Sequence, residues 1–397
     1  MRELREELFK RLDEKEDKIK EIRRHLHEYP ELSFEEEETS AYIKDFYKDK
    51  DVKIYDELNG QHGLVVEIKG DKPGKTIGLR ADFDALPIKE ASDVPFKSKN
   101  DGVMHACGHD AHTAYLMVVA ETLIEMKSQL PGTVKIIHQH AEEVPPGGAR
   151  DIIASGAIDD LDEIYGIHYF PQIETGKLFI HSGPTFAGRS NFDLTIKGKG
   201  GHAALPQEAK DALVAGAYFV TEAQTVVSRR IDPLETMVVT VSAFDAPGGY
   251  NVIQDEVTLR GTVRYMNEDL KETAYNEIKR IVEGIETSFG VTADLDYKYD
   301  YPVLHNSEQE MKEIIETLNE SAGTYFKEIV DLGEITGSED FSYYLTQFKG
   351  NFFVVGAMPE NSDEMYSLHH PKMKLNEDAF IIAAKSVTDV LLSRLTK

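Results

Sequence analysis

Cysteine is almost absent from this sequence, because Cys107 is the only one among 397 residues. No disulfide can therefore form within the chain, and a lone thiol is typical of the reducing cytoplasm, where we expect the protein to act. The sequence also lacks the run of about 18 apolar residues that a membrane-spanning helix needs. No apolar stretch of signal-peptide length follows Met1. These absences predict a protein without a membrane partner.

Basic residues are scarce relative to acidic ones. The chain has 44 Lys and Arg against 71 Asp and Glu, which gives a formal net charge of −27. Such a chain repels nucleic-acid phosphates and anionic membrane surfaces, so we exclude both as main partners. The hydrophobic fraction of 41% is that of a folded globular protein.

The first part of the chain, residues 1–181, combines helical and strand patterns. Amphipathic helical spacing continues up to Pro30, and a helix rich in Ala, Leu and Met is expected over about 109–126. Short apolar strands lie on either side of that helix, at 64–68, 76–80, 134–138 and 164–168. The alternation predicts an α/β layer with a partly parallel sheet. It returns after Tyr301, with helices near 308–321 and 377–395 and a strand over 352–356.

The pattern changes near residue 182. Over 191–197 apolar and polar residues alternate, as in a strand with one solvated face. Further strands and helices give the order β-α-β-β-α-β, which is typical of a small ferredoxin-like sandwich. We therefore predict a discontinuous main domain over 1–181 and 299–397, interrupted by a ferredoxin-like α+β domain over 182–298.

A cluster of metal-ligand residue types lies at 105–112, His-Ala-Cys-Gly-His-Asp-Ala-His. Cys and His are the ligands that zinc-like metals prefer. The ordinary interpretation, a buried cysteine near surface histidines, has about equal weight when this stretch is considered alone.

Four other groups stand where strands or loops end. Glu142 and Glu143 follow a strand, and one could bind metal while the other acts as a general base. His168 ends a strand, where functional groups of α/β sheets gather. His369 and His370 form a loop pair. The stretch 80–87, Arg-Ala-Asp-Phe-Asp-Ala-Leu-Pro, ends a strand with two acids, one of which could orient a ligand imidazole. Each group could also be an ordinary turn, cap or surface feature.

The joint order of these motifs is far more specific. It comprises 80–87, 105–110, Ala-Glu-Glu at 141–143, Gly-Ile-His at 166–168, Gly-Lys-Gly-Gly-His-Ala-Ala-Leu-Pro at 198–206, Ser-Glu-Asp-Phe at 338–341 and Leu-His-His-Pro at 368–371. This order resembles the aminoacylase/carboxypeptidase G family of two-metal amidohydrolases and peptidases. Within it, the Cys-Gly-His-Asp form is similar to hippurate hydrolases, indole-acetyl-amino-acid hydrolases and N-acetyl-diaminopimelate deacetylases.

The resemblance implies a mixed-sheet α/β/α catalytic domain of the phosphorylase/hydrolase-like zinc peptidase type, with the inserted domain as a lid that makes a homodimer or a higher oligomer. It implies Glu142 as general base and Asp84 as the acid that orients the metal centre. It also implies that two divalent metals, manganese or zinc with cobalt or nickel as options, are held by Cys107, His109, Glu143, His168 and His369. Relatives usually have a small residue at the position of His370, so the choice between His369 and His370 stays open.

Three residues of the insert are implied to act on the substrate. His202 matches the residue that helps to hold the oxyanion in a neighbouring subunit's site. Asn251 and Arg264 match lid positions that bind the substrate carboxylate. The implied reaction is hydrolysis of the amide of an N-acyl amino acid or a short peptide by a metal-activated water, with Glu142 moving the proton.

Several alternatives are kept open. Within the same family, the activity could be that of an aminopeptidase, dipeptidase or carboxypeptidase. The loop Gly198–Gly200 fits a relaxed dinucleotide fingerprint, which would predict an oxidoreductase; the alternating strand before it and Pro206 argue against that. A Cys107 nucleophile and an acidic metal-buffering protein are further options, and an assay on N-acyl amino acids separates the last one from an enzyme.

Overall fold

The computed structural model describes residues 1–396, and the chain divides into two compact units. The first unit contains Met1–Gly183, His305–Gly333 and the chain from Asp340 onward. The second contains Pro184–Leu304 and Glu334–Glu339, a short segment outside the predicted insert. The chain passes between the units within β7 (Gly183–Phe186) and again within β14 (Leu304–Asn306). Among residues 1–396, no helix is both long enough and apolar enough to cross a membrane.

The first unit is built on an eight-stranded mixed sheet with the order β1-β2-β4-β3-β5-β16-β6-β15. β3 pairs in parallel with both β4 and β5, and β5 pairs in parallel with β16. β2 pairs antiparallel with β1 on one side and with β4 on the other. The predicted mixed α/β sheet is thus confirmed. The strands are β1 (Lys53–Tyr55), β2 (Leu64–Lys69), β3 (Lys72–Asp82), β4 (Pro131–Gln139), β5 (Glu163–Phe170), β6 (Lys177–Phe179), β15 (Glu328–Val330) and β16 (Lys349–Gly356).

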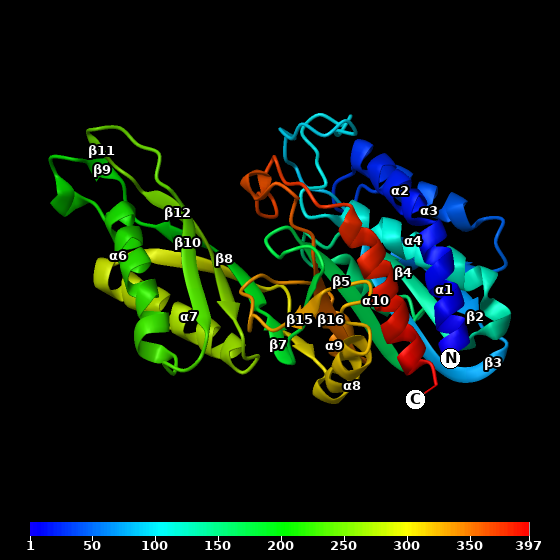
Figure 1. Ribbon diagram of the computed structural model, residues 1–397. Coiled ribbons are helices and arrows are strands. Elements are labelled where there is room, and N and C mark those ends of the chain that lie inside the picture. The colour runs from blue at the N-terminus through cyan, green and yellow to red at the C-terminus, as the bar shows by residue number, and fades with distance from the viewer. Residues whose placement is uncertain (397) are drawn as a thin grey trace. The chain divides into compact units, whose positions relative to one another are not determined.

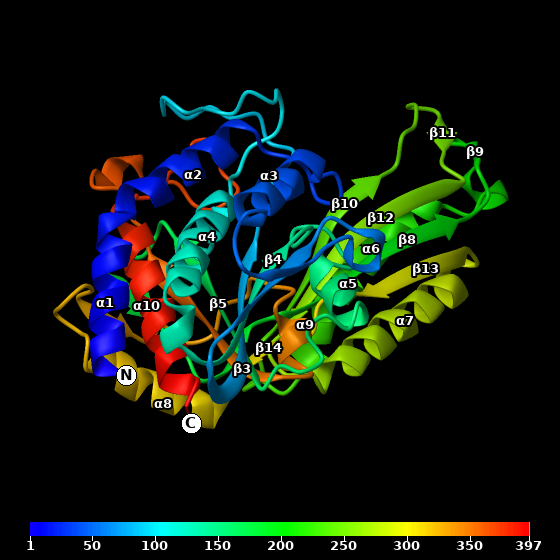
Figure 2. The same cartoon turned by 90° about the vertical axis from the view of Figure 1, so that its right-hand side faces the viewer.

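Helices cover this sheet, and the larger layer consists of α1, α2, α3, α4, α8 and α10 (Figures 1 and 2). In α1, Leu4, Leu8 and Leu12 are buried at a spacing of four residues, which places one apolar face against the core. The helices are α1 (Arg2–Glu14), α2 (Glu16–Glu28), α3 (Glu37–Tyr47), α4 (His109–Glu125), α5 (Gly148–Ala154), α8 (Glu308–Asn319), α9 (Ser342–Leu345) and α10 (Asp378–Arg394).

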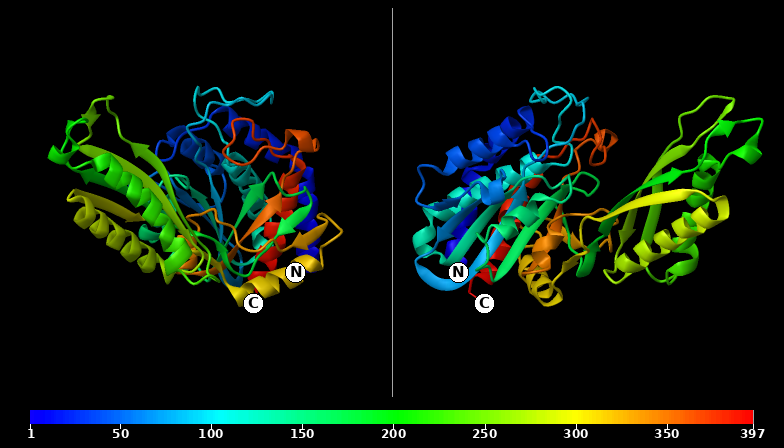
Figure 3. Two further views of the ribbon diagram at one scale, coloured as in Figure 1. Left: turned by 90° about the vertical axis from the view of Figure 1, so that its left-hand side faces the viewer. Right: turned by 180° about the vertical axis from the view of Figure 1, so that it is seen from behind.

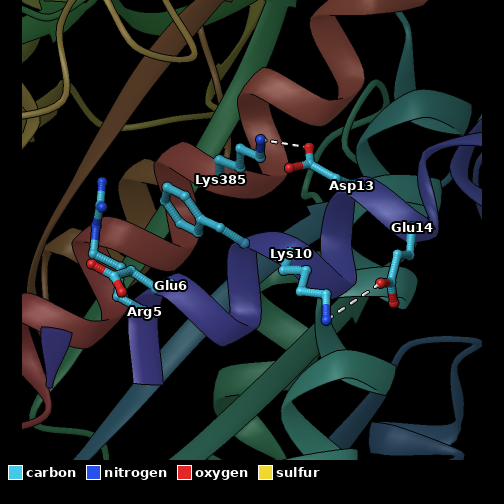
Figure 4. Close-up of a pocket in the computed structure, with 7 residues that line it drawn as sticks. Arg5, Glu6, Lys10, Asp13, Glu14 and Lys385 are labelled. Atoms are coloured by element: carbon cyan, nitrogen blue, oxygen red, sulfur yellow. Dashed lines mark ion pairs between the residues drawn. The ribbon is translucent and has the colours of Figure 1, made fainter. Parts of the chain in front are cut away.

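A surface pocket of about 540 Å³ lies beside α1, where this helix packs against α10 (Figure 4). Its charged side chains neutralise one another: Lys385 pairs with Asp13 at 2.5 Å, and Lys10 pairs with Glu14 at 3.9 Å. None of the site residues predicted from the sequence lines this pocket.

The second unit is a ferredoxin-like sandwich, as the sequence predicts. Its antiparallel sheet has the order β10-β12-β8-β13, and α6 and α7 pack on one face (Figures 1 and 3). Along β8, Phe192, Leu194 and Ile196 are buried beneath those helices, and the residues between them lie on the other face. The elements are β8 (Gly188–Lys197), β9 (Gly201–His202), α6 (Ala212–Thr225), β10 (Met237–Asp245), β11 (Val252–Ile253), β12 (Glu256–Tyr265), α7 (Leu270–Phe289) and β13 (Thr292–Tyr299).

Candidate metal centre

The carboxyl ends of β3, β4 and β5 form the floor of the candidate site. The three strands are parallel, and the register places Asp82 at the end of β3 beside Gln139 at the end of β4. Segments that follow parallel strands emerge at the same edge of a sheet, where α/β proteins bind their ligands. Residues that are far apart in the sequence are therefore brought together here.

His109 is the first residue of α4, and a glycine sets its position. Gly108 precedes it with φ of 95°, a left-handed conformation that favours glycine. The Nδ1–H of His109 donates to Oδ1 and to the backbone oxygen of Asp84, both at 3.0 Å. Its Nε2 is buried without a hydrogen-bond partner among the described residues, and a carboxylate oxygen, Oδ2 of Asp82, lies 3.7 Å away. That nitrogen is therefore available to a cation.

Cys107 and His168 contribute the neighbouring donor atoms. His168 Nε2 lies 3.4 Å from Cys107 Sγ, and His168 Nδ1–H donates to the backbone oxygen of Tyr169 at 2.8 Å. In the neutral ring this leaves the lone pair of Nε2 facing the thiol. The ligand atoms of Cys107, His109 and His168 all lie within 4.8 Å of one another. A buried orphan nitrogen beside a thiol and a second imidazole is a donor set that fits zinc-like metals.

Glu143 and His369 extend the cluster. Together with Cys107 they form a second group of ligand atoms within 4.8 Å, so the thiol belongs to both groups. His369 Nε2 lies 3.2 Å from Glu143 Oε1. The ring of His370 turns elsewhere, because it stacks on Tyr366 and its Nδ1 accepts the backbone N–H of Lys372 at 3.1 Å. The structure thus brings His369, rather than His370, to the cluster.

Asp84 connects both parts of this cluster from a buried position. Besides His109, it receives the hydroxyl of Ser33 at 2.7 Å and the backbone N–H of Glu143 at 3.0 Å on Oδ2. Burial alone would raise its pKa, but the hydrogen bond from His109 lowers the pKa below its usual range. Asp84 is therefore held as a carboxylate that fixes the orientation of His109.

Glu142 is buried beside Glu143, and its Oε1 lies 3.4 Å from the backbone N–H of Asp340. One ligand atom each of His109, Glu142 and Glu143 forms a further group within 4.8 Å. The turn before it is unusual, because Ala141 has φ of 50°. The N–H of Ala141 donates to Oε1 of buried Glu36 at 2.8 Å. Glu36, which the sequence analysis did not select, thus supports the backbone that carries Glu142.

A fully buried polar network continues below the cluster. The guanidinium of Arg80 donates to Asp82 at 2.7 Å, to Asp340 at 2.8 Å and to Gln139 at 2.9 Å. Asp82 also accepts Nδ1–H of His112 at 2.6 Å. Arg80 and Asp340 stand in motifs that the sequence analysis quoted, but it gave them no role. Only the folded chain shows that they brace the ends of β3 and β4.

The hydrogen bonds of His112 distinguish it from the metal-ligand candidates. It forms a close group with Asp82 and His109. Its Nδ1 is engaged by Asp82, however, and its Nε2 accepts the backbone N–H of Tyr169 at 3.1 Å. Both ring nitrogens are therefore used within the protein, and His112 positions its neighbours.

Charge in the cluster favours a cation. Burial raises the pKa of the Cys107 thiol well above its usual value, and the carboxylate of Glu143 adds to this. Burial opposes a charge on His109, but Asp82 raises the pKa of this imidazole well above its usual value. Burial lowers the pKa of His168 well below its usual value. A divalent cation among these groups would compensate the acids and stabilise the thiolate.

The other predicted residues, His202, Asn251 and Arg264, lie in the second unit. His202 is in β9, opposite Val252 of β11, and is exposed. Asn251 precedes β11, and its backbone oxygen accepts the N–H of Ala203 at 3.0 Å. Arg264 is on β12 and is half-buried. Their predicted contacts with substrate stay predictions.

The loop at Gly198–Gly200 does not have the geometry of a dinucleotide-binding turn. The strand before it, β8, lies in an antiparallel sheet, and the loop leads into β9. The next α-helix, α6, begins only at Ala212. A dinucleotide fingerprint instead joins a parallel strand directly to a helix N-terminus. The oxidoreductase alternative is therefore wrong.

Comparison with known proteins identifies the family. The model of peptidase family M20/M25/M40 matches residues 78–393. The N-acetylcysteine deacetylase of Bacillus subtilis is 36% identical over 364 residues, which cover 92% of this chain and 93% of the relative.

Two solved structures are similar along nearly the whole chain. The structure of a protein from methicillin-resistant Staphylococcus aureus, proposed to be an aminohydrolase, has 48% identity and a TM-score of 0.91, covering 98% of this chain and 100% of that one. A dinuclear metal-binding peptidase of the M20 family from Bacillus subtilis has 30% identity and a TM-score of 0.80, covering 96% and 99%. The chain therefore belongs to peptidase family M20/M25/M40 and is a metal-dependent hydrolase of amide bonds.

Proposed function

We propose that this protein is a two-metal amidohydrolase that removes the acyl group from N-acyl amino acids. The observation that carries the proposal is the convergence of five donors beside a sixth, separate carboxylate. The donors are Cys107, His109, Glu143, His168 and His369, and the carboxylate is Glu142. The name of the deacetylase relative supports an N-acyl amino acid, rather than a peptide, as the substrate.

Each side chain then has a defined task. The five donors would hold two divalent cations, which acidify a water molecule and polarise the substrate carbonyl when bound. Glu142 accepts the proton of the attacking water and passes it to the departing nitrogen. Asp84 fixes the orientation of the His109 ring through its 3.0 Å bond to Nδ1, which would leave Nε2 free to hold a cation. His202 would stabilise the oxyanion, and Asn251 and Arg264 would bind the substrate carboxylate.

The donor types also support particular metals and a location. A thiolate, imidazoles and a carboxylate suit zinc or manganese, with cobalt and nickel as further candidates in vitro. A buried thiol that serves as a ligand must stay reduced, which supports a cytoplasmic location.

We further propose that the second unit makes a homodimer, with higher oligomers as another outcome of the same measurement. Large apolar side chains are exposed along α6, among them Leu213 at 41% and Tyr218 at 54%. β10 is an edge strand of the sheet and exposes Val238 and Phe244. An exposed edge next to an apolar helix face is suited to pairing with a second copy.

The test compares two adjacent glutamates. We expect Glu142→Gln to keep the metal content of the wild type and to lower kcat at least about 100-fold, since it loses the general base. The matched variant, Glu143→Gln, should lose metal, because it removes a donor. Metal is measured by elemental analysis, and activity on a panel of N-acyl amino acids, dipeptides and carboxypeptidase substrates. Near-normal turnover of Glu142→Gln would refute its role, and preference for peptides would identify a peptidase.

A further inference from the structure

Two arginines face each other on adjacent strands of the second unit. Arg189 of β8 and Arg264 of β12 are direct partners in the antiparallel register. The residues that flank Arg264, Val263 and Tyr265, are buried in the core beneath α6 and α7. Since side chains alternate along a strand, both arginines lie on the face that the helices leave open. They lie at the end of the sheet where the chain enters this unit.

The pair has more positive charge than its surroundings neutralise. Asp300 Oδ2 accepts Nε–H of Arg189 at 3.1 Å and an amide N–H of Asn191 at 2.6 Å. Arg264 donates to neutral oxygens only, the hydroxyl of Thr262 and the backbone oxygen of Val263. Among residues 1–396, Arg264 has no ion pair. The carboxylate of Asp300 is therefore the one negative charge paired with these two guanidinium groups among the described residues.

Such an arrangement costs stability unless an anion binds. Like charges directly opposite on neighbouring strands repel each other. Burial, together with the charge of Arg189, lowers the pKa of Arg264 to about 10, which is still a charged group at neutral pH. Arg189 is held in place by its stacking on Tyr301, with the guanidinium 5.0 Å from the ring centre. Both arginines are half-buried, and Asp300 pairs with Arg189 but not with Arg264.

We propose that Arg189 and Arg264 form a site for two carboxylates and select N-acyl amino acids with an acidic side chain. This rests on the proposed function, in which Arg264 and Asn251 bind the substrate carboxylate and Arg189 has no role. Side chains of directly paired strand residues begin about 5 Å apart, a spacing comparable to that of the two carboxylates of aspartate or glutamate. Each planar guanidinium can bind one carboxylate through parallel hydrogen bonds.

The test uses two substrates that differ by one charge, N-acetyl-L-glutamate and N-acetyl-L-glutamine. We expect the wild type to prefer the glutamate by about tenfold or more in kcat/KM, mainly through KM, because a charge-assisted hydrogen bond is lost with the amide. Arg189→Gln should bring the ratio close to one, and Arg189→Lys should give an intermediate ratio. An unchanged ratio in Arg189→Gln, equal losses on both substrates, or no wild-type preference would overturn the proposal.

The matched control is Arg260→Gln. Arg260 lies on the same face of β12 but already pairs with Asp245 at 3.0 Å and with Asp193 at 3.8 Å. Its side chain is 59% exposed. Because its charge is compensated, the control should keep the wild-type ratio. A loss of preference in the control would show that the general charge of this face, and not the pair, attracts the dicarboxylate, and would overturn the proposal.

A binding measurement separates this inference from the proposed function. Calorimetry compares glutarate with glutaramate, which has one carboxylate fewer, on the wild type, Arg189→Gln and Arg260→Gln. If no N-acyl amino acid is hydrolysed, the proposed function fails. In that case a preference for glutarate that depends on Arg189 would still support the pair. Equal affinity of the wild type for both compounds would overturn it.

Discussion

Replacing Glu36 with glutamine should stabilise the first unit at pH 8 and do little at pH 5. Glu36 is fully buried, and its Oε2 has no partner among the described residues. Burial, and then the nearby charge of Asp84, raise its pKa from 4.5 to about 8. Well below pH 4.5 the carboxyl is protonated in both the folded and the unfolded state, so its ionisation does not change the free energy of unfolding. As the pH rises toward 8, only the unfolded state ionises freely, and the folded state loses stability.

The magnitude follows from the two pKa values, about 8 when folded and 4.5 when unfolded. The cost of the carboxyl is about 1 kcal/mol at pH 5 and about 4 kcal/mol at pH 8. Glutamine has no such cost, and its amide oxygen can still accept the N–H of Ala141, which bonds Oε1 at 2.8 Å. The stability difference between Glu36→Gln and the wild type should therefore grow by roughly 3 kcal/mol between these pH values.

Hydrogen exchange of the metal-free protein, on peptides that cover β4, measures this effect, because it reports opening of the first unit separately from the second. Cations near Asp84 would lower the pKa of Glu36 and reduce the difference. The control is Glu31→Gln in the same segment. Glu31 accepts the backbone N–H groups of Glu38 and Thr39 at 3.2 and 2.7 Å, so its loss should destabilise at both pH values. A Glu36→Gln difference that stays constant from pH 5 to pH 8 would refute the reasoning.

Three further outcomes are expected. Arg80→Met should destabilise the first unit by about 3–5 kcal/mol in the same exchange experiment, because it leaves the buried carboxylates of Asp82 and Asp340 uncompensated; a smaller change would mean that water or repacking replaces the guanidinium. Chelation should abolish activity and lower Tm, and manganese or zinc should restore both, since a ligand that binds only the folded state stabilises it; an unchanged Tm would contradict a metal held by buried donors. Tyr218→Glu should convert the dimer to a monomer in sedimentation velocity at unchanged metal content, and a persistent dimer would exclude the exposed face of α6 from the interface.

The elements that could be predicted from the sequence are those with a long, regular pattern. β5 and α10 are rich in apolar residues, β4 has the apolar stretch around Val134, Ile136 and Ile137, and β8 alternates along most of its length. The short elements escaped prediction. β6 and β15 have three residues each, too few for any periodicity, and they exist because neighbouring strands offer them hydrogen bonds.

The residues of the candidate site also fall into those that the sequence predicted and those that only the fold revealed. Cys107, His109 and Glu142 stand in local motifs with suitable residue types, and the order of those motifs along the chain, through the family that it resembles, implies their roles. Glu36 is one of four consecutive glutamates at 35–38, and nothing local distinguishes the one that receives the N–H of Ala141, 105 positions away. The structural role of Arg80 could not be predicted either, because its partner Asp340 is 260 positions away. Contacts at such a range are properties of the folded chain and leave no periodic signal.

The packing of α1 against α10 has a consequence for how the protein is made. Arg5 bonds Asp389 across 384 positions of sequence. A ribosome that adds about 5–20 residues per second needs roughly 20 to 80 s to synthesise the second partner after the first. During that time α1 can already contact α2 and α4, but its packing against α10 is missing. The second unit, apart from one short segment, ends at Leu304 and can fold while synthesis continues. Nascent chains arrested before α10 should therefore hold a folded insert beside an unfinished catalytic unit.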